Sequence, residues 1–345
     1  MPTHPVSDLL RPELSEYQAY VPHPGNYAVR LDANEAPPLL SQAARARLLE
    51  VAAKTSFERY PDASVEALRQ ALATHSGVTP AEVLVGVGSD ELIALLLSAL
   101  SQPRAGTDAP VVLTTTPSFV MYAMSARLRG QRVLEVPLDA NWDLSSSGIA
   151  AAARVAEPSV VFIASPNNPT GNKMSLDRLA ALIEALPRSL VIVDEAYVDY
   201  SDQNQLELYR RYPNVGVLRT LSKIGFAGLR VGWLIAAPEL VQELDKIRPP
   251  YNMCTLSQEL ARVAVSELGP EIARTVASVV AERSRVATSP QRSSPGLSLT
   301  PSQANFLWVR SEKPAETAVR ESQDSRYPGA QLPCARRATL ASVAR

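Results

Sequence analysis

Between residues 64 and 236, short apolar runs alternate with segments of helical periodicity. The runs are rich in β-branched residues and mostly lack polar alternation, which is typical of strands buried on both faces. Helical spacing of apolar residues marks 64–77, 90–100 and 176–186. This alternation predicts an α/β fold with one mostly parallel, seven-stranded sheet covered by helices on both faces. The expected strands are 83–86, 111–115, 132–136, 160–165, 190–194, 215–220 and 230–236.

The segments on either side of this α/β region have different patterns. Seven prolines within residues 1–40 predict an extended arm with at most one short helix. Residues 253–287 are expected to be mainly helical, with a break at Gly269-Pro270, and 298–310 to form a turn leading into a strand. We therefore expect three parts, which are an N-terminal arm that joins a small domain (1–40), a large domain (41–245) and a small α+β domain (246–345).

Composition narrows the class of protein. The 345 residues carry a formal net charge of −1, which gives no electrostatic footprint for nucleic acid or an acidic membrane surface. The longest apolar run, 92–100, is too short to span a membrane, and the first residues lack the apolar core of a signal peptide. Two cysteines cannot form a disulfide framework, which favours a reducing compartment. We expect a cytoplasmic protein with no metal site and neither nucleic acid nor membrane as partner.

Lys223 differs from the other lysines, of which the chain has only five among 34 basic residues. It directly follows a predicted strand, and strand carboxyl ends are where doubly wound sheets bind ligands. A lysine amine can lose its proton and attack a carbonyl, which an arginine guanidinium cannot do. Thr220, Ser222 and Arg230 could hold a phosphate through their hydroxyls and guanidinium. The alternative for an isolated lysine of this kind is a surface position in a loop.

Three other predicted strands also end in polar residues. Asp194 would be a half-buried carboxylate in need of a cationic or N–H partner, or a helix cap. Residues 165–171, SPNNPTG, form a rigid turn that would fix the direction of an Asn side chain, or a turn and nothing more. In GVGSDELI (86–93), the amides of Ser89 and Asp90 open a helix, which suits a phosphate. Its spacing is not that of a dinucleotide or P-loop motif, and the acidic residues also suit a helix N-terminus without a ligand.

Together these four features match the needs of one cofactor. Pyridoxal phosphate requires an anchor for its phosphate, a hydrogen-bond donor for its ring oxygen, a carboxylate for its pyridine nitrogen and an amine for its aldehyde. A phosphate-binding turn, a directed Asn, a buried Asp and a lysine follow four predicted strands in that order. The sequence therefore predicts a pyridoxal-phosphate site at the carboxyl edge of the sheet.

The sequence resembles the fold-type I pyridoxal-phosphate-dependent aminotransferases, and among them the histidinol-phosphate aminotransferase family. The matching motifs occur in the family's order through most of residues 14–310, and as a set they are highly specific. They are RLDANEAP (30–37), RYPD (59–62), GVGSDELI (86–93), PSFVMY (117–122), SPNNPTGN (165–172), VDEAYVDY (193–200), RTLSKIGFAGLR (219–230) and SQANFLWVR (302–310). The resemblance implies the fold-type I architecture, with a large cofactor-binding domain and a smaller α+β domain.

The resemblance also implies roles for the residues that match. Lys223 would bond to the cofactor aldehyde and shuttle a proton, and Asp194 would keep the pyridine nitrogen protonated. The other cofactor contacts would be Asn168 and Tyr197 at the ring oxygen, Phe119 stacked on the ring, and Ser89, Asp90, Thr220, Ser222 and Arg230 at the phosphate.

Further residues would act at the subunit boundary and on the substrate. The resemblance implies that Tyr60 reaches the phosphate of the neighbouring subunit's cofactor, so that the enzyme is a homodimer. Tyr17 and Asn34 would line the substrate side of the site. The implied reaction transfers the amino group of L-glutamate to imidazole acetol phosphate, giving L-histidinol phosphate and 2-oxoglutarate in histidine biosynthesis.

Two alternatives to this activity remain open. One keeps the fold and changes the substrate, as in an aromatic amino-acid aminotransferase or a threonine-phosphate decarboxylase-like enzyme. The other is a protein that binds the cofactor and is inactive because its C-terminus is altered. After about residue 311 the family's final segment, with its substrate-binding arginine, is not recognisable. Arg336, in CARRATL, lies near the expected place and is the candidate for that role. Residues 321–345 have no clear periodicity, which predicts a loose tail or a changed reading frame.

Overall fold

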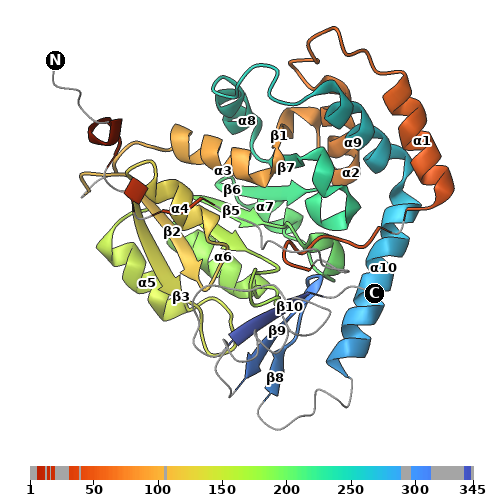
Figure 1. The fold of residues 1–345 in the computed structure, drawn as a ribbon. Coiled ribbons are helices and arrows are strands. Elements are labelled where there is room, and N and C mark those ends of the chain that lie inside the picture. The colour runs from red at the N-terminus through yellow and green to blue at the C-terminus, as the bar shows by residue number, and fades with distance from the viewer. Residues whose placement is uncertain are drawn as a thin grey trace.

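A computed structural model of the chain describes residues 6–11, 14–15, 17–19, 31–38, 40–104, 107–288, 297–311 and 338–342. Its centre is a seven-stranded sheet with the strand order β1-β7-β6-β5-β4-β2-β3 (Figure 1). Each predicted strand is present, and the sheet is mostly parallel as expected. The strands are β1 (Val83–Val87), β2 (Val111–Thr116), β3 (Arg132–Pro137), β4 (Val160–Ala164), β5 (Leu190–Asp194), β6 (Val215–Thr220) and β7 (Val231–Ile235).

Strand β7 is the exception to the parallel arrangement. It lies between β1 and β6 and is antiparallel to both. Its Gly232 pairs with Gly86 on one side and with Thr220 on the other. The carboxyl ends of β1 and β6 therefore lie on either side of the amino end of β7, and both lead into the candidate site described below.

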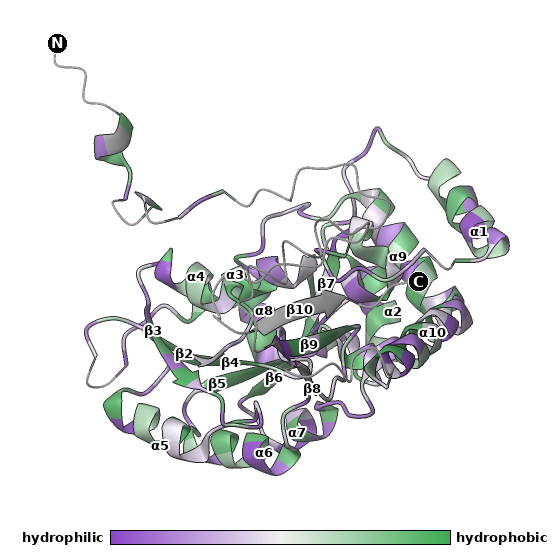
Figure 2. Ribbon diagram, turned by 60° about the horizontal axis from the view of Figure 1, so that its bottom comes forward, coloured by the Kyte–Doolittle hydropathy of each residue, from purple (hydrophilic) through white to green (hydrophobic). Residues whose placement is uncertain are grey.

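Helices cover both faces of the sheet (Figure 2). On one face, α3 (Gly88–Ala99), α4 (Met121–Arg127) and α8 (Pro238–Asp245) bury residues such as Leu92, Leu96 and Tyr122 against the strands. On the other face, α5 (Ser146–Val155), α6 (Leu176–Ala185) and α7 (Leu206–Arg211) bury Ile149 and Leu182. The strands between these layers are apolar because both of their faces are removed from water.

Strand β3 does not fit the expectation that the strands are buried on both faces. It forms one edge of the sheet, and five of its six residues are exposed or only partly buried. Val136 is the buried one. An edge strand has one unpaired side and is covered less completely than a central strand. The polar residues within 132–137 are consistent with this position.

The remaining helices lie beside the β1 end of the sheet, and a second, smaller sheet follows them along the chain (Figure 1). Helix α9 (Thr255–Glu267) packs against α1 (Gln42–Ala53) and α2 (Glu66–Ser76). Helix α10 begins at Gly269, which confirms the predicted break. Strands β8 (Leu297–Thr300), β9 (Phe306–Ser311) and β10 (Ala338–Ser342) form an antiparallel sheet in the order β10-β9-β8. Strand β10 was not predicted from the sequence, and for residues 298–310 only one strand was expected, where β8 and β9 in fact flank a turn. Helix α10 ends at Ala287. Among the described residues, the short helices are η1 (Val6–Leu9), η3 (Pro80–Glu82), η4 (Val198–Tyr200), η5 (Ser222–Phe226) and η6 (Ala227–Leu229).

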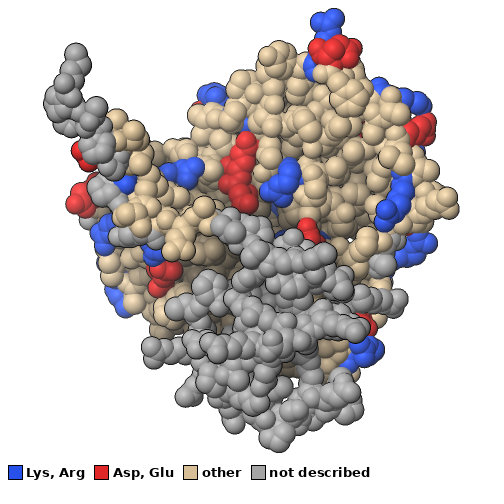
Figure 3. Space-filling model, in the orientation of Figure 1, with Lys and Arg blue, Asp and Glu red and all other residues tan. Residues whose placement is uncertain are grey.

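The described surface carries interspersed charge. On the face drawn in Figure 3, Lys and Arg side chains are scattered among acidic and uncharged residues. Within the part of the chain that the structure describes, no helix combines the length and the apolar character needed to cross a membrane.

Candidate functional site

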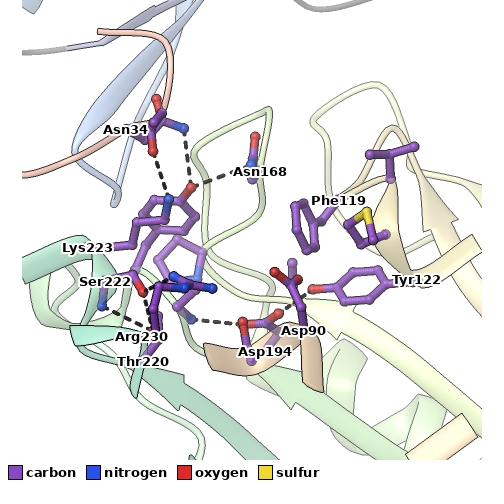
Figure 4. Close-up of a pocket in the computed structure, with 18 of the residues that line it drawn as sticks. Asn34, Asp90, Phe119, Tyr122, Asn168, Asp194, Thr220, Ser222, Lys223 and Arg230 are labelled. Carbon is purple, nitrogen blue, oxygen red and sulfur yellow. Dashed lines mark hydrogen bonds between the residues drawn. The ribbon is translucent and has the colours of Figure 1, made fainter. Parts of the chain in front are cut away.

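A cavity of about 400 Å³ opens at the carboxyl ends of the parallel strands (Figure 4). Segments that follow β1, β2, β4, β5 and β6 contribute to its wall, and residues 32–34 cover one side. The cavity thus lies where doubly wound sheets place their ligands. It brings together eleven of the residues proposed from the sequence, which are Asn34, Ser89, Asp90, Phe119, Asn168, Asp194, Tyr197, Thr220, Ser222, Lys223 and Arg230.

Asp194 lies at the base of the cavity, at the end of β5. Asp194 is only 4% exposed, so it is more deeply buried than the half-buried carboxylate expected from the sequence. The Tyr122 hydroxyl donates to Asp194 Oδ2 at 2.6 Å, and the Ala196 amide donates to Oδ1 at 3.0 Å. Burial raises the pKa of Asp194, while these two hydrogen bonds favour its charged form and oppose the shift. A cation beside this carboxylate would be held strongly.

Lys223 follows β6 on the short helix η5. The Tyr200 hydroxyl donates to the Lys223 carbonyl at 2.5 Å and so fixes the backbone at this point. Two residues later, Gly225 has a φ of 104°, a conformation that side-chain-bearing residues rarely adopt. The Lys223 Nζ atom donates to the Ala33 carbonyl at 2.8 Å. The amine is therefore directed into the cavity and toward the segment that covers it (Figure 4).

An amide and phenol cluster lies next to Lys223. The Asn34 side chain donates to the Tyr197 hydroxyl at 3.2 Å, and the Asn168 side chain contacts the same hydroxyl at 3.5 Å. The Lys223 Nζ atom lies 5.7 Å from the centre of the Tyr197 ring. Asn34 has a φ of 53°, and its carbonyl accepts a hydrogen bond from the buried Asn305 side chain. Three segments far apart in sequence thus meet at one phenolic oxygen.

A corner rich in hydrogen-bond donors lies opposite this cluster, where β1 enters α3. The Thr220 and Ser222 hydroxyls are 2.9 Å apart, and Arg230 Nη1 lies 3.5 Å from the Ser222 hydroxyl. The amides of Ser89 and Asp90 belong to the first turn of α3, where N–H groups have no partner within the helix. Hydroxyls, a guanidinium and a helix N-terminus together form a surface suited to a phosphate.

Phe119 lines the wall that lies across the cavity from Lys223 (Figure 4). Its ring meets that of Tyr122 edge to face, with 5.5 Å between the ring centres. Tyr122 in turn stacks on Phe162 at 5.1 Å. An apolar ring on this side could cover one face of a planar ligand placed above Asp194.

Three of the residues proposed from the sequence are not gathered into this cavity. Tyr60 is 81% exposed and stacks on Tyr251, with 4.8 Å between the ring centres. Tyr17 is described, and it does not line the cavity. Arg336 lies outside the described residues. The roles assigned to these three residues therefore stay predictions.

Tyr122 was not among the residues predicted from the sequence, although its hydroxyl is a direct partner of Asp194. The residue ends the PSFVMY motif, one helical turn after Phe119. A second aromatic residue at this spacing was the available signal. Asn167 also received no role, and it holds the SPNNPTG turn together by donating to the Pro117 carbonyl at 3.0 Å and to the Thr170 hydroxyl at 2.8 Å. This leaves Asn168 to line the cavity.

Residues 27–325 match the family described as aminotransferase class I and II. The chain belongs to this family. It is similar to a histidinol-phosphate aminotransferase of Methylibium petroleiphilum, with 38% identity over 308 residues that cover 88% of this chain and 81% of the relative. A histidinol-phosphate aminotransferase of Chromobacterium violaceum is also 38% identical, over 88% of this chain and 84% of its own length.

A solved structure is similar over a comparable span. It is the histidinol-phosphate aminotransferase from Sinorhizobium meliloti in complex with pyridoxal-5'-phosphate, which has a TM-score of 0.82 and 26% identity. The similarity covers 92% of this chain and 87% of that chain. The α/β fold with a seven-stranded, mostly parallel sheet is thus the fold of class I and II aminotransferases, as the sequence predicted.

Proposed function

We propose that this aminotransferase uses pyridoxal phosphate to move an amino group between L-glutamate and imidazole acetol phosphate, with L-histidinol phosphate and 2-oxoglutarate as products. One relationship supports the proposal more than any other. Within a single cavity, Asp194 faces Lys223 from the base, and the Ser222–Arg230 corner lies beside both. This arrangement offers partners for a pyridine nitrogen, an aldehyde and a phosphate at the same time.

The residues present fit pyridoxal phosphate. The donor set of Thr220, Ser222 and Arg230 suits a dianion, and the cradle at α3 is open because Gly88 has no side chain. A Cβ on Gly88 would lie 2.7 Å from Arg230 Nη2, so a larger residue would fill the space beside the guanidinium. Gly88 also has a φ of 76°. The site therefore combines positive charge, free amides and room at the same point.

When bound, pyridoxal phosphate supplies a carbonyl that accepts the amino group and a ring that withdraws electrons from the reacting carbon. The protein would supply the remaining functions. Lys223 would bond to the carbonyl carbon with loss of the carbonyl oxygen as water. Once the substrate amine has displaced it, the free Lys223 Nζ would take a proton from one carbon and return it to another. The hydrogen bonds from Tyr122 and Ala196 favour the charged form of Asp194, and this carboxylate would hold the proton on the ring nitrogen. Tyr197 and Asn168 would orient the ring through its oxygen.

Support for the substrate comes from the curated relatives, which are named histidinol-phosphate aminotransferases. Both compounds that can donate the amino group are anionic, because L-glutamate carries carboxylates and L-histidinol phosphate carries a phosphate ester. Asn34 and its neighbours Asp32 and Ala33 line one side of the cavity, where they could contact such a substrate. We assign Asn34 to substrate contact, and we retain Tyr17 and Arg336 as predictions for the same role.

We further propose that the enzyme is a cytoplasmic homodimer in which Tyr60 completes the neighbouring site. Tyr60 is too exposed for a core role, and with Tyr251 it forms an aromatic surface outside its own cavity. Exposed aromatic residues are frequent at subunit interfaces. Cys254 is exposed and free, which suits a reducing compartment.

Covalent labelling tests the cofactor proposal. Reduction of the protein with borohydride in the presence of pyridoxal phosphate should attach a pyridoxyl group to Lys223, detected by peptide mass mapping. The Lys223→Ala variant should lose both the label and the absorbance band of the bound cofactor. Lys246→Ala is the matched control, because Lys246 is an exposed lysine paired with Glu243. Labelling that persists in Lys223→Ala would contradict the proposal.

A substrate panel tests the assignment of the reaction. Histidinol phosphate should convert the cofactor to its amine form faster than phenylalanine or threonine phosphate does. Faster reaction with phenylalanine would indicate an aromatic aminotransferase, and loss of carbon dioxide from threonine phosphate would indicate a decarboxylase. A bound cofactor that reacts with none of them, including glutamate, would indicate an inactive protein.

Subunit complementation tests the role of Tyr60. Lys223→Ala and Tyr60→Ala chains should each be nearly inactive alone, while a mixed dimer would contain one complete site. Random pairing should restore about a quarter of the activity of an equal amount of the parent enzyme, because half of the dimers are mixed and each has one intact site. No recovery in dimers that are shown to be mixed would exclude a contribution of Tyr60 across the interface.

A further inference from the structure

Gly232 of strand β7 lies directly under the turn that opens α3. The residue pairs with Gly86 on β1 and Thr220 on β6, so it sits between the two strands that lead into the donor-rich corner. A Cβ on Gly232 would lie 2.6 Å from the carbonyl carbon of Gly88 and 2.6 Å from the amide nitrogen of Ser89. The Gly88 oxygen would be 3.1 Å away. The peptide between Gly88 and Ser89 thus packs directly against the Cα atom of Gly232.

This contact differs from the contacts of the other glycines in β1 and β6. A Cβ on Gly86 or Gly216 would first meet side-chain atoms of Leu92 or Ile192, and side chains can rotate away. The atoms above Gly232 are backbone, and they belong to the first turn of a helix that packs on the sheet. A side chain at position 232 would therefore displace the peptide itself and not a flexible group.

The Gly88–Ser89 peptide contains one of the hydrogen-bond donors of the proposed phosphate site. Ser89 N–H is one of the amides at the start of α3 that have no partner within the helix. On its other side, Gly88 approaches Arg230 so closely that a Cβ on Gly88 would be 2.7 Å from Nη2. The peptide is thus confined between strand β7 and the guanidinium, and a shift of a few tenths of an ångström changes the distance between the two donors.

We propose that Gly232 is a positioning residue for phosphate recognition. It fixes the position of the Ser89 amide relative to Arg230 and Ser222. This inference rests on the proposed function, because it concerns the same cofactor site. Gly232 does not touch the ligand and acts through the Gly88–Ser89 peptide. Its effect should therefore fall on ligands with a phosphate and spare ligands without one.

The test compares two ligands that differ only in the phosphate. Dissociation constants for pyridoxal phosphate and pyridoxal are measured by equilibrium dialysis with the parent enzyme and Gly232→Ala. We expect Gly232→Ala to weaken pyridoxal phosphate binding roughly 10- to 100-fold, the loss typical of one hydrogen bond to a charged group, with pyridoxal binding nearly unchanged. Gly228→Ala is the control, because a Cβ there meets nothing within 4 Å and the backbone is not left-handed.

A second variant keeps the inference testable if Gly232→Ala does not fold. Ser89→Pro removes the amide hydrogen by a change on α3 and leaves the sequence of β7 intact, and proline is tolerated in the first turn of a helix. It should cause the same selective loss of pyridoxal phosphate affinity. Equal weakening of both ligands in the folded Gly232→Ala variant, or an unchanged ratio in Ser89→Pro, would overturn the inference. A parent enzyme that binds both ligands equally would instead contradict the phosphate site of the proposed function.

Discussion

The Tyr122 hydroxyl donates a hydrogen bond to Asp194 across 2.6 Å, and both residues are almost completely buried at the base of the cavity. Tyr122 is 0% exposed and Asp194 is 4% exposed. The phenol comes from α4 and the carboxylate from the end of β5, so the packing of a helix on the sheet determines how the carboxylate is held. Burial and the neighbouring carboxylate raise the pKa of Tyr122, which keeps this hydroxyl a donor.

Replacing Tyr122 with Phe should weaken cofactor binding in a pH-dependent way. The hydroxyl favours the charged form of Asp194, so its loss raises the pKa of Asp194 above the value in the parent protein. The charged form is then populated only at higher pH, and the acidic limb of cofactor affinity should move to higher pH. At neutral pH we expect a loss of about tenfold, measured by dialysis across a pH series.

Tyr212→Phe is the matched control for this experiment. Its hydroxyl also donates to a carboxylate, that of Glu184 at 2.5 Å, on an exposed part of the protein outside the cavity. This substitution should leave the pH profile in place. An unchanged acidic limb in Tyr122→Phe would mean that the phenol only fills space.

Asp194→Asn should stabilise the cofactor-free protein while removing activity. Because burial raises the folded-state pKa of Asp194, its ionisation opposes folding at any pH above that value. The penalty declines as the pH falls through the folded-state pKa and is absent below the unfolded-state pKa. At neutral pH we expect Asn to add roughly 1–3 kcal/mol to the free energy of unfolding, the size of a buried polar group's desolvation.

Thermal unfolding of cofactor-free protein between pH 5 and 8 measures this effect. The gain should shrink as the pH is lowered, and kcat should fall by about 100-fold or more because an electrostatic partner of the reaction is lost. A variant that is less stable than the parent at neutral pH would show that Asp194 contributes favourable contacts that outweigh its desolvation.

The strand positions could be predicted from the sequence because each strand is a short apolar run bounded by polar turns. The position of β7 between β1 and β6 could not be predicted from the sequence, because it depends on which strands β7 pairs with when the chain returns to the sheet. Lys223, Asn168 and Ser89 line the cavity because each lies within four residues after the end of a strand, and Asp194 is itself the last residue of β5. Such positions can be read from the sequence, whereas the roles of these residues stay predictions. The Tyr122–Asp194 contact could not be seen, because it joins a helix and a strand that are 72 residues apart. Strand β10 was missed because its pairing with β9, rather than its own pattern, defines it.

Substitutions at Asn34 should separate backbone strain from side-chain function. Asn34 has a φ of 53°, where Asn and Gly are tolerated and Ala is strained. Asn34→Ala should therefore reduce the free energy of unfolding by about 1 kcal/mol more than Asn34→Gly does. Both variants lose the amide that donates to Tyr197, so both should lower kcat/KM for histidinol phosphate to a similar extent. If Asn34→Gly keeps the parent kcat/KM, the amide plays no part in the reaction and the residue serves only the turn.

The buried ion pair between Arg219 and Glu195 should dominate the electrostatic part of stability near the site. Arg219 Nε donates to Glu195 Oε2 at 2.8 Å, and the Glu195 side chain is 0% exposed. Burial raises the pKa of Glu195, although Arg219 opposes the shift. Arg219→Leu would leave this carboxylate buried without its cation, which should cost about 3–5 kcal/mol in the free energy of unfolding.

Denaturant unfolding of the cofactor-free protein measures this loss, and a second substitution identifies its cause. If the unpaired charge is responsible, Arg219→Leu combined with Glu195→Leu should recover a large part of the lost stability, because the pair then becomes apolar. Lys173→Ala breaks the exposed pair with Asp202 and should cost less than about 1 kcal/mol. A double variant that is no more stable than Arg219→Leu alone would assign the loss to packing of the arginine stem, since the buried charge would then be absent and the stability still low.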